Sequence, residues 1–253
     1  MTEHKKVMLA TVILKSVDSQ VYASHLTFAY RCGRECPDYD FWIATPQRWA
    51  IDSARNLVVQ TCINYNIDYL FFYDDDTYLE KSGMKQMLEV METHPEVHVL
   101  SGHYLIRGYP FPLMAFIEDE KEKLKWRHIT QEEAEHLTSN GLIGPLKAVG
   151  NGCTLYRVEL FKKIDTHKKP EDRIWFKTIM HQVTEDIFFF AKMHNQLENV
   201  GVYMMSNLVM GHQIADRDIV DKANVKILKE RWERDAAFIQ RHNIDGLEEK
   251  DCS

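Results

Sequence analysis

Short apolar runs alternate with amphipathic segments through the first hundred residues of the chain. The apolar runs have the length of buried strands, and they predict strands at residues 7–14, 41–44, 67–73 and 97–101. The segments between them predict helices at residues 20–30, 51–65 and 81–91. An alternation of strand and helix is typical of βα units on a mostly parallel sheet, so the predicted fold class is α/β.

The second half of the chain is less regular. It predicts strands at residues 113–117, 147–156 and 200–205, and helices at 130–138, 158–164, 184–194 and about 216–242. Thr130, followed three residues later by Glu133, predicts a capping box. The Gly150-Asn151-Gly152 sequence predicts a backbone bend or a close approach of a ligand within the apolar run around it.

Composition indicates a folded protein. The 253 residues are enough for one large domain or two small ones, and we expect one because no linker, repeat or low-complexity tract interrupts the chain. A hydrophobic fraction of 45% and a total of 12 Phe, 11 Tyr and 5 Trp exclude a disordered chain.

The formal net charge of -7 argues against broad binding of nucleic acid, since such binding depends on cations that neutralise phosphates. One stretch is locally basic, with Lys162, Lys163, Lys168, Lys169, Arg173 and Lys177. A run of this kind is either a solvated surface or a local site for an anionic partner.

Five scattered cysteines lack the spacing of a zinc finger or of a disulfide scaffold, which favours a reducing compartment. The apolar run at residues 7–14 is too short for a signal sequence, and no other run approaches the length of about 18 to 20 residues that a membrane span needs. We therefore expect a cytoplasmic protein without a membrane span.

Three consecutive aspartates, Asp74, Asp75 and Asp76, follow the apolar run at residues 67–73. If the chain stays extended, Asp74 and Asp76 point to the same side of the strand. Two carboxylates at the carboxyl end of a strand suit a hard divalent cation, and ligands bind at this edge of open α/β sheets. The alternative is a solvated acidic turn before a helix.

Further short motifs follow one another in a fixed order. An Arg-Asn pair precedes the aspartates by one helix, a Gly-containing strand end follows them, and a Gly-containing loop, a Glu-Asp pair and a Gly-His pair come later. These are Arg55-Asn56, Ser101-Gly102-His103-Tyr104, Gly150-Asn151-Gly152, Glu185-Asp186 and Gly211-His212. The ordered set covers residues 7–212 and resembles the family-2-like, nucleotide-sugar-dependent glycosyltransferases of the GT-A fold, with their DxD and ED motifs.

The resemblance implies a GT-A (Rossmann-like) fold with a mixed, mostly parallel central sheet flanked by helices. It also implies one domain over residues 1–253, with a nucleotide-binding half at about 1–105, an acceptor and catalytic half at about 106–215 and a C-terminal helix at about 216–242. The donor substrate is then a nucleoside diphosphate sugar, and the cofactor is Mn²⁺ or Mg²⁺.

Site residues follow from the same resemblance. Asp76 is the direct metal ligand, His212 is a second metal ligand, and Asp74 contacts the nucleotide ribose or the water shell of the metal. Arg55 lies near the nucleotide or its phosphates, and Gly152 belongs to the loop that holds the donor sugar. Residues at the end of the first strand, Lys15 and Ser16, lie where the family holds the base.

Glu185 and Asp186 begin the helix predicted from Thr184. In inverting relatives an acid at this place deprotonates the acceptor hydroxyl, and general-base catalysis needs such a group within hydrogen-bond reach of that proton. We expect Asp186 to be the base, with Glu185 as the competing candidate. The alternative is that both acids only stabilise the positive end of the helix dipole.

Residues 165–182 show little periodicity and predict a long loop of a kind that often has a function. Trp175 lies in this loop, just before the Glu-Asp pair. We expect the loop to close over the donor as a lid.

The leading functional hypothesis is a metal-dependent glycosyltransferase, hexosyl- or pentosyl-transferring, that acts with inversion on a hydroxyl acceptor. The acceptor is a glycan, a small molecule or a hydroxymethylated DNA base. Two alternatives stay open: a metal-dependent phosphotransferase or nuclease, because clustered acids also hold ions for phosphoryl chemistry, and a non-catalytic nucleotide-sugar-binding protein on the same fold.

Overall fold

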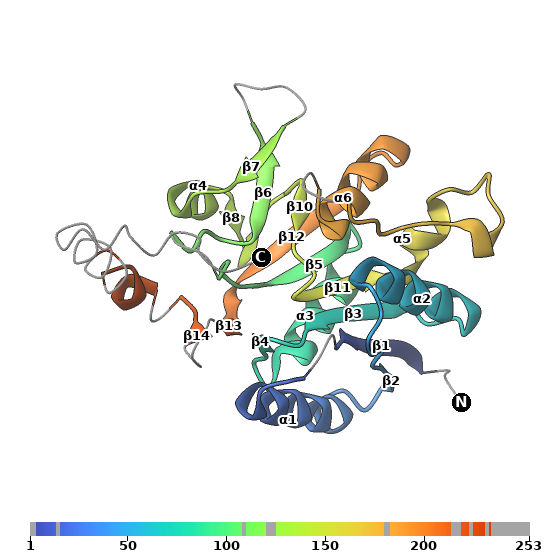
Figure 1. Ribbon diagram of the computed structural model, residues 1–253, viewed down its shortest axis with the longest axis horizontal. Coiled ribbons are helices and arrows are strands. Elements are labelled where there is room, and N and C mark those ends of the chain that lie inside the picture. Colours follow the sequence, from blue (N-terminus) through green and yellow to red (C-terminus); the bar gives the residue numbers. More distant parts are fainter. Residues whose placement is uncertain are drawn as a thin grey trace, which may run out of the picture.

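A computed structural model describes residues 4–13, 16–107, 110–119, 125–179, 183–213, 219–222, 225–230 and 233 (Figure 1). Its centre is an eight-stranded sheet with the order β2-β1-β3-β11-β5-β12-β9-β8. These strands are β1 (Lys5–Val12), β2 (Tyr39–Ala44), β3 (Tyr69–Asp74), β5 (Val97–His103), β8 (Thr138–Ser139), β9 (Leu142–Ile143), β11 (Cys153–Arg157) and β12 (Gly201–Val209).

The sheet is mixed and mostly parallel. β1 pairs in parallel with β2 and β3, and β12 pairs in parallel with β5. β11 lies between β3 and β5 and runs antiparallel to both. Strands from the first and the last part of the described chain thus share one sheet, and the predicted α/β class, with a mixed, mostly parallel central sheet flanked by helices, is confirmed.

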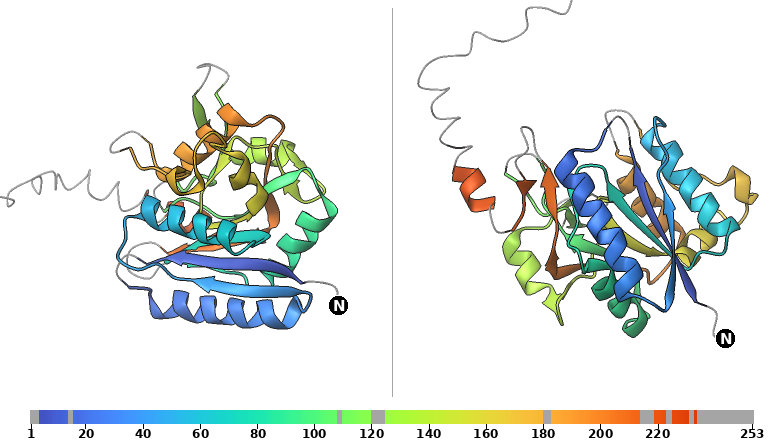
Figure 2. Two further views of the ribbon diagram at one scale, coloured as in Figure 1. Left: turned by 90° about the vertical axis from the view of Figure 1, so that its right-hand side faces the viewer. Right: turned by 90° about the horizontal axis from the view of Figure 1, so that it is seen from below.

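Helices cover both faces of the sheet (Figure 2). One face carries α1 (Ser19–Glu35) and α3 (Gly83–Thr93), and the other carries α2 (Ile51–Asn64), α5 (Val158–Lys163) and α6 (Glu185–Gln196). β3 serves both cores because successive side chains point to opposite faces. Leu70 and Phe72 pack under α2, α5 and α6, whereas Phe71 packs under α1 and α3.

Two small sheets extend the main one. The first has the order β10-β6-β7, from β10 (Ala148–Val149), β6 (Ala115–Glu118) and β7 (Trp126–His128), and the second has the order β14-β13-β4, from β14 (Ile219–Val220), β13 (Gly211–Gln213) and β4 (Thr77–Tyr78). The predicted strand at residues 147–156 is therefore split at its glycines between β10 and β11. The bend predicted there is confirmed.

Local signals placed one short helix accurately. α4 (Gln131–His136) begins after Thr130, whose side chain accepts a hydrogen bond from the backbone of Glu133 while the Glu133 carboxylate accepts one from the backbone of Thr130. The predicted capping box is confirmed. The helix predicted from about residue 216 begins later, since residues 219–220 form β14 and helical residues start at 225. The rest of that prediction lies outside the described residues.

The long loop at residues 165–179 is anchored to α2. The Asn56 side chain accepts hydrogen bonds from the backbone of Trp175 and Phe176 and donates one to the carbonyl of Phe176. Trp175 is only 1% exposed and donates its indole N–H to the Phe161 carbonyl. The Trp175 ring is therefore part of the core, and closure of the loop over a donor stays a prediction. The loop also contains the 3-10 turn η1 (Pro170–Asp172).

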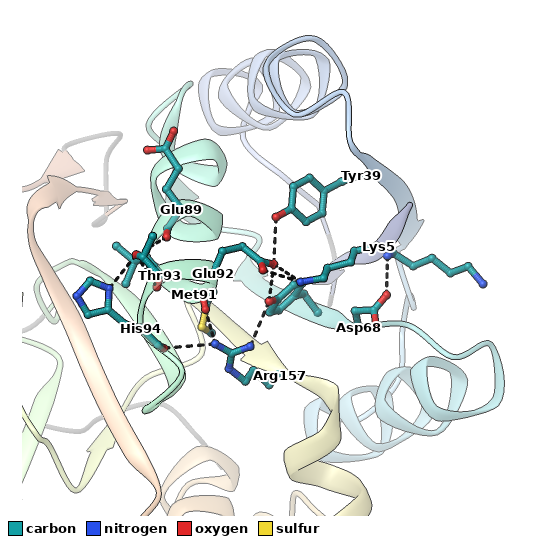
Figure 3. Close-up of polar contacts among 12 residues, drawn as sticks. Lys5, Tyr39, Asp68, Glu89, Met91, Glu92, Thr93, His94 and Arg157 are labelled. Atoms are coloured by element: carbon teal, nitrogen blue, oxygen red, sulfur yellow. Dashed lines mark hydrogen bonds and ion pairs between the residues drawn. The ribbon is translucent and has the colours of Figure 1, made fainter. Parts of the chain in front are cut away.

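A polar network closes the edge of the sheet opposite to the aspartates (Figure 3). The Glu92 carboxylate accepts hydrogen bonds from Lys5 at 2.6 Å, Tyr69 at 2.8 Å and Tyr39 at 3.2 Å. Arg157 donates to the Val97 carbonyl at 2.8 Å and also binds carbonyls at the end of α3. Cations at a helix C-terminus stabilise it, so this network joins α3 to the sheet.

Within the described part of the chain, every helix is too short or too polar to cross a membrane.

Candidate active site

The three aspartates lie where β3 ends and the chain turns into β4. Asp74 is the last residue of the strand, and its backbone N–H donates to the Gly152 carbonyl at 3.3 Å. Asp75 and Asp76 form the turn, so the chain does not stay extended as the alternation argument assumed. Asp74 and Asp76 still lie near each other: burial raises the pKa of Asp74, Arg55 opposes the rise, and the charge on Asp76 adds to it.

Arg55 joins the aspartates to α6. Its guanidinium donates to Asp74 Oδ1 at 2.8 Å and pairs with Glu185 Oε1, and it stacks over the Phe72 ring with 5.6 Å to the centroid. Only 1% of Arg55 is exposed. The guanidinium is thus buried and bound by two carboxylates, and its predicted place near the nucleotide or its phosphates stays a prediction.

Glu185 and Asp186 occupy different environments although they are neighbours at the start of α6. Burial raises the pKa of Glu185, and the ion pair with Arg55 opposes that rise. Asp186 is 6% exposed, and its Oδ1 accepts hydrogen bonds from the Thr184 hydroxyl and from the backbone N–H of Ile187 at 2.8 Å. Among the described residues, its Oδ2 has no hydrogen-bond partner. Thr184 is the N-cap residue of α6 by position, but its hydroxyl donates to Asp186 and does not accept a hydrogen bond from the helix backbone, as a capping side chain would.

Asp76 is held by a second group of contacts. The antiparallel pairing of β13 with β4 places His212 opposite Thr77, and its Nε2 lies 3.4 Å from Asp76 Oδ1. Arg107, whose side chain is 61% exposed, donates to Asp76 Oδ2 at 2.7 Å. Burial acts to raise the pKa of Asp76, but His212 and Arg107 together hold it below its ordinary value.

The tautomer of His212 bears on the predicted metal site. Its Nδ1 lies 2.9 Å from the Leu105 carbonyl oxygen, which only accepts, so Nδ1 carries the hydrogen. Nε2 then faces a carboxylate oxygen of Asp76: it donates to that oxygen in the imidazolium, and in the neutral ring its lone pair and the carboxylate could share a cation. A backbone-bound imidazole beside a carboxylate is a typical metal-ligand arrangement.

The fit is partial, however. Among the residues that the structure describes, no group of three His, Cys, Asp or Glu side chains could hold a metal ion as they now lie. Asp76 and His212 fit the donor set for Mn²⁺ or Mg²⁺, whereas Asp74 gives one oxygen to Arg55. Metal binding by Asp74, Asp76 and His212 stays a prediction.

The glycine-containing loop between β10 and β11 lies against the aspartates. The Gly152 N–H donates to the Tyr104 hydroxyl at 3.0 Å, and a Cβ added at Gly152 would lie 3.1 Å from Thr77 Oγ1. A Cβ added at Gly150 would lie 2.2 Å from the Tyr104 hydroxyl, so glycine is needed there for a close approach. The predicted loop and the predicted metal site are thus neighbours.

Two buried polar atoms without a hydrogen-bond partner among the described residues lie at the same loop, Thr77 Oγ1 and Asn151 Nδ2. Thr77 Oγ1 would lie 3.1 Å from a Cβ added at Gly152, and Asn151 precedes Gly152. Buried polar atoms are nearly always paired, so these donors and acceptors indicate a place for a polar ligand.

Several site residues were missed by the sequence argument. Thr77 and Arg107 carry no pattern, and only their neighbours in space show their place. Ser16 follows β1 on the edge of the sheet that Asp74 occupies and is exposed, and its role toward a base stays a prediction; Lys15 lies outside the described residues.

Comparison with solved structures agrees with the fold. The crystal structure of A197 from STIV aligns with a TM-score of 0.53 and 17% identity over 85% of this chain and 93% of that one. S. aureus TarS 1-349 aligns with a TM-score of 0.43 and 11% identity over 80% of this chain and 58% of that one. A glycosyltransferase involved in the glycosylation of the major capsid of PBCV-1 aligns with a TM-score of 0.34 and 9% identity over 62% of both chains.

No protein-family model matches the chain, and no curated protein matches it. The likeness to A197 therefore extends to the fold, and the chemistry has to be argued from the site.

Proposed function

We propose that this protein is a metal-dependent glycosyltransferase of the GT-A type that transfers a sugar from a nucleoside diphosphate sugar to a hydroxyl acceptor, with inversion. One observation carries the proposal: Arg55 ties Asp74 at the end of β3 to Glu185 at the start of α6, and Asp186 and the Asp76–His212 pair lie at the same edge of the sheet. Asp74, Glu185 and His212, which follow Arg55 by 19, 130 and 157 positions in the sequence, thereby belong to one acidic site.

The Asp76–His212 pair is the proposed metal site. One carboxylate oxygen and one imidazole nitrogen would supply two ligands for Mn²⁺ or Mg²⁺, in place of the ion pair that Asp76 makes with the exposed Arg107. When bound, the cation supplies Lewis-acid stabilisation of the negative charge on the departing diphosphate. In the absence of the cation, Arg107 neutralises the Asp76 carboxylate.

Asp186 is the proposed general base. Glu185 is committed to Arg55, whereas Asp186 keeps Oδ2 free of hydrogen bonds among the described residues while Oδ1 is fixed by Thr184 and Ile187. A base needs a fixed orientation and one open oxygen within reach of the acceptor proton. The acceptor hydroxyl gives its proton to Asp186 Oδ2 as its oxygen attacks the anomeric carbon.

Arg55 and Glu185 are positioning residues in this scheme. They bind each other, and Arg55, which also pairs with Asp74, thereby links α6 and the end of β3 through α2. We assign binding of the donor sugar or its diphosphate to Thr77 Oγ1 and Asn151 Nδ2, which lack partners among the described residues, and to the Gly152 loop. We assign base binding to Ser16 and Lys15, which follow β1.

The four described cysteines are free thiols, which supports the proposed cytoplasmic location.

The decisive experiment measures slow hydrolysis of a panel of nucleoside diphosphate sugars without an acceptor. We expect hydrolysis of at least one donor with Mn²⁺ or Mg²⁺ and none after chelation. Asp76→Asn should remove the metal-dependent activity. The matched control is Asp38→Asn, at an exposed position before β2, which should keep it. Undiminished turnover in Asp76→Asn, or transfer of phosphate in place of release of a nucleoside diphosphate, would refute the proposal.

A further inference from the structure

A groove of about 730 Å³ lies between α6 and the small sheet β10-β6-β7. Figure 1 shows this sheet beside α6, away from α1 and α2. α6 contributes side chains at three- and four-residue spacing, which share one helix face: Ile187, Ala191, His194 and Asn195. The opposite wall comes from Phe116, Glu118, Lys125, Trp126 and Lys147. The volume is in the range of ligand-binding sites.

One end of the groove lies at the start of α6. Val183 lines it just before the Glu185-Asp186 pair, and Ile187 lines it just after. The backbone N–H of Ile187 is also the group that fixes Asp186 Oδ1, at 2.8 Å. A molecule that fills the groove from its Ile187 end therefore has that end one residue along the helix from Asp186, whose own side chain is not among those that line the groove. From Ile187 to Asn195 the helix face is about 12 Å long at a rise of 1.5 Å per residue, which is longer than one sugar ring.

The groove combines flat rings with polar groups of both charges, from Glu118, Lys125 and Lys147. The half-buried Trp126 ring meets His194 edge to face, with 5.9 Å between centroids and an interplanar angle of 85°. His194 Nε2 lies 2.8 Å from the Lys147 carbonyl oxygen, and burial lowers the pKa of His194, so the ring is neutral at pH 7. The Lys147 ammonium pairs with the Glu118 carboxylate at 3.2 Å.

We propose that this groove binds a neutral oligosaccharide, which is the acceptor of the proposed transferase and presents its terminal hydroxyl to Asp186. Apolar faces of sugar rings pack on aromatic rings, and their hydroxyls bond to carboxylate, ammonium and amide groups such as those of Glu118, Lys147 and Asn195. A polyanion fits less well, because the Glu118 carboxylate lines the groove and pairs with Lys147, and the chain has a net charge of -7. This inference rests on the proposed function.

The test is isothermal titration of the full chain with maltohexaose, cellohexaose and chitohexaose, and with a single-stranded oligodeoxythymidylate as the polyanion. We expect at least one of the oligosaccharides to bind and Trp126→Ala to weaken it roughly tenfold or more. Ala191→Trp, which fills the groove and leaves the core side chains in place, should weaken it similarly. Trp42→Ala is the matched control, since Trp42 is 40% exposed on β2 at the far edge of the sheet.

The inference is overturned if none of the oligosaccharides binds, if binding survives both groove variants, or if the oligodeoxythymidylate binds there instead. The metal-dependent hydrolysis of the donor by the unaltered protein, measured without oligosaccharide, reports on the proposed function alone. Hydrolysis without groove binding removes only this inference, and groove binding without hydrolysis removes the proposed function and leaves an oligosaccharide-binding site.

Discussion

Replacing Arg55 by methionine tests the physical link between the two halves of the candidate site. The change keeps most of the side-chain volume over Phe72 and removes the guanidinium that joins Asp74 to Glu185. Both carboxylates then lack their cation while they remain at the sheet edge. An unpaired buried charge costs far more than a missing surface ion pair.

The expected loss follows from the geometry of the two ion pairs. Unit charges about 4 Å apart attract by about 4 kcal/mol at an effective dielectric constant of about 20. The Glu185 pair is the larger contributor, because the Glu185 side chain is 9% exposed and that of Asp74 is 34% exposed and partly screened. Breaking a buried ion pair by removing one partner costs roughly 3–5 kcal/mol, and we expect Arg55→Met to fall in that range.

The assay is urea unfolding at pH 7, with the free energy of unfolding taken from the midpoint and slope. Arg31→Met is the matched control: Arg31 pairs with Glu35 one turn away on the surface of α1, and its removal should cost less than about 0.5 kcal/mol. Adding Glu185→Gln to Arg55→Met should recover part of the loss, because it removes one of the two stranded charges.

The pH dependence has a defined sign. Burial already raises the pKa of Asp74 and Glu185 above their ordinary values, and removal of Arg55 raises both further. Groups with a raised folded pKa contribute stability that is fully present below the unfolded pKa and is lost as the pH rises through the folded pKa. The defect of Arg55→Met should therefore shrink on acidification towards the ordinary carboxyl range. A variant as stable as the Arg31→Met control at pH 7 would refute the reasoning.

Three further changes have distinct expected results. Asp186→Asn should slow sugar transfer by roughly 10²–10⁴-fold while donor binding, followed by calorimetry, is retained; transfer at the unaltered rate would exclude Asp186 as the base. Gly150→Ala should lower the free energy of unfolding by about 1–3 kcal/mol, because its Cβ would lie 2.2 Å from the Tyr104 hydroxyl. The control is Gly33→Ala in α1, where an added Cβ meets no neighbouring group within 4 Å, and it should be neutral or stabilising. Equal effects in the two variants would contradict the packing argument. Glu92→Gln should cost about 1 kcal/mol at pH 7. Burial acts to raise the pKa of Glu92, but hydrogen bonds from Lys5 and Tyr69 lower it below 4.5. The stability that the Glu92 carboxylate contributes is therefore present above pH 4.5 and is lost as the pH falls through the folded pKa. A cost of Glu92→Gln that persists in acid would show that the charge of the carboxylate is not the source of that cost.

The two carboxylates of the Glu-Asp pair illustrate what neighbouring residues in a sequence leave open. Both acids fit the first turn of a helix, and both were candidates for the base. Their difference comes from residues far along the chain: Glu185 meets Arg55 from α2, while Asp186 is bound by its own Thr184 and Ile187. Local pattern has no information on a partner 130 positions away.

For His212, too, the sequence supplied a candidate but not the contacts that set its chemistry. Its resemblance to a metal-binding histidine gave a candidate among twelve histidines. The pairing of β13 with β4 brings it opposite Thr77 and next to Asp76, and the Leu105 carbonyl sets its tautomer. None of these contacts follows from spacing along the chain.

The sequence alone determined the features that depend on short-range periodicity. Apolar runs and helical spacing located β1, β3, α2 and α6, two side chains located the capping box of α4, and glycines located the bend between β10 and β11. These succeed because a strand or a helix must repeat its buried positions every two or 3.6 residues. The tertiary structure alone decided the pairing of Arg55 with two carboxylates, the burial of Trp175, the β14 strand and the groove beside α6. Those depend on which faces meet when the sheet closes, and charge, burial and contact between distant residues exist only after that packing.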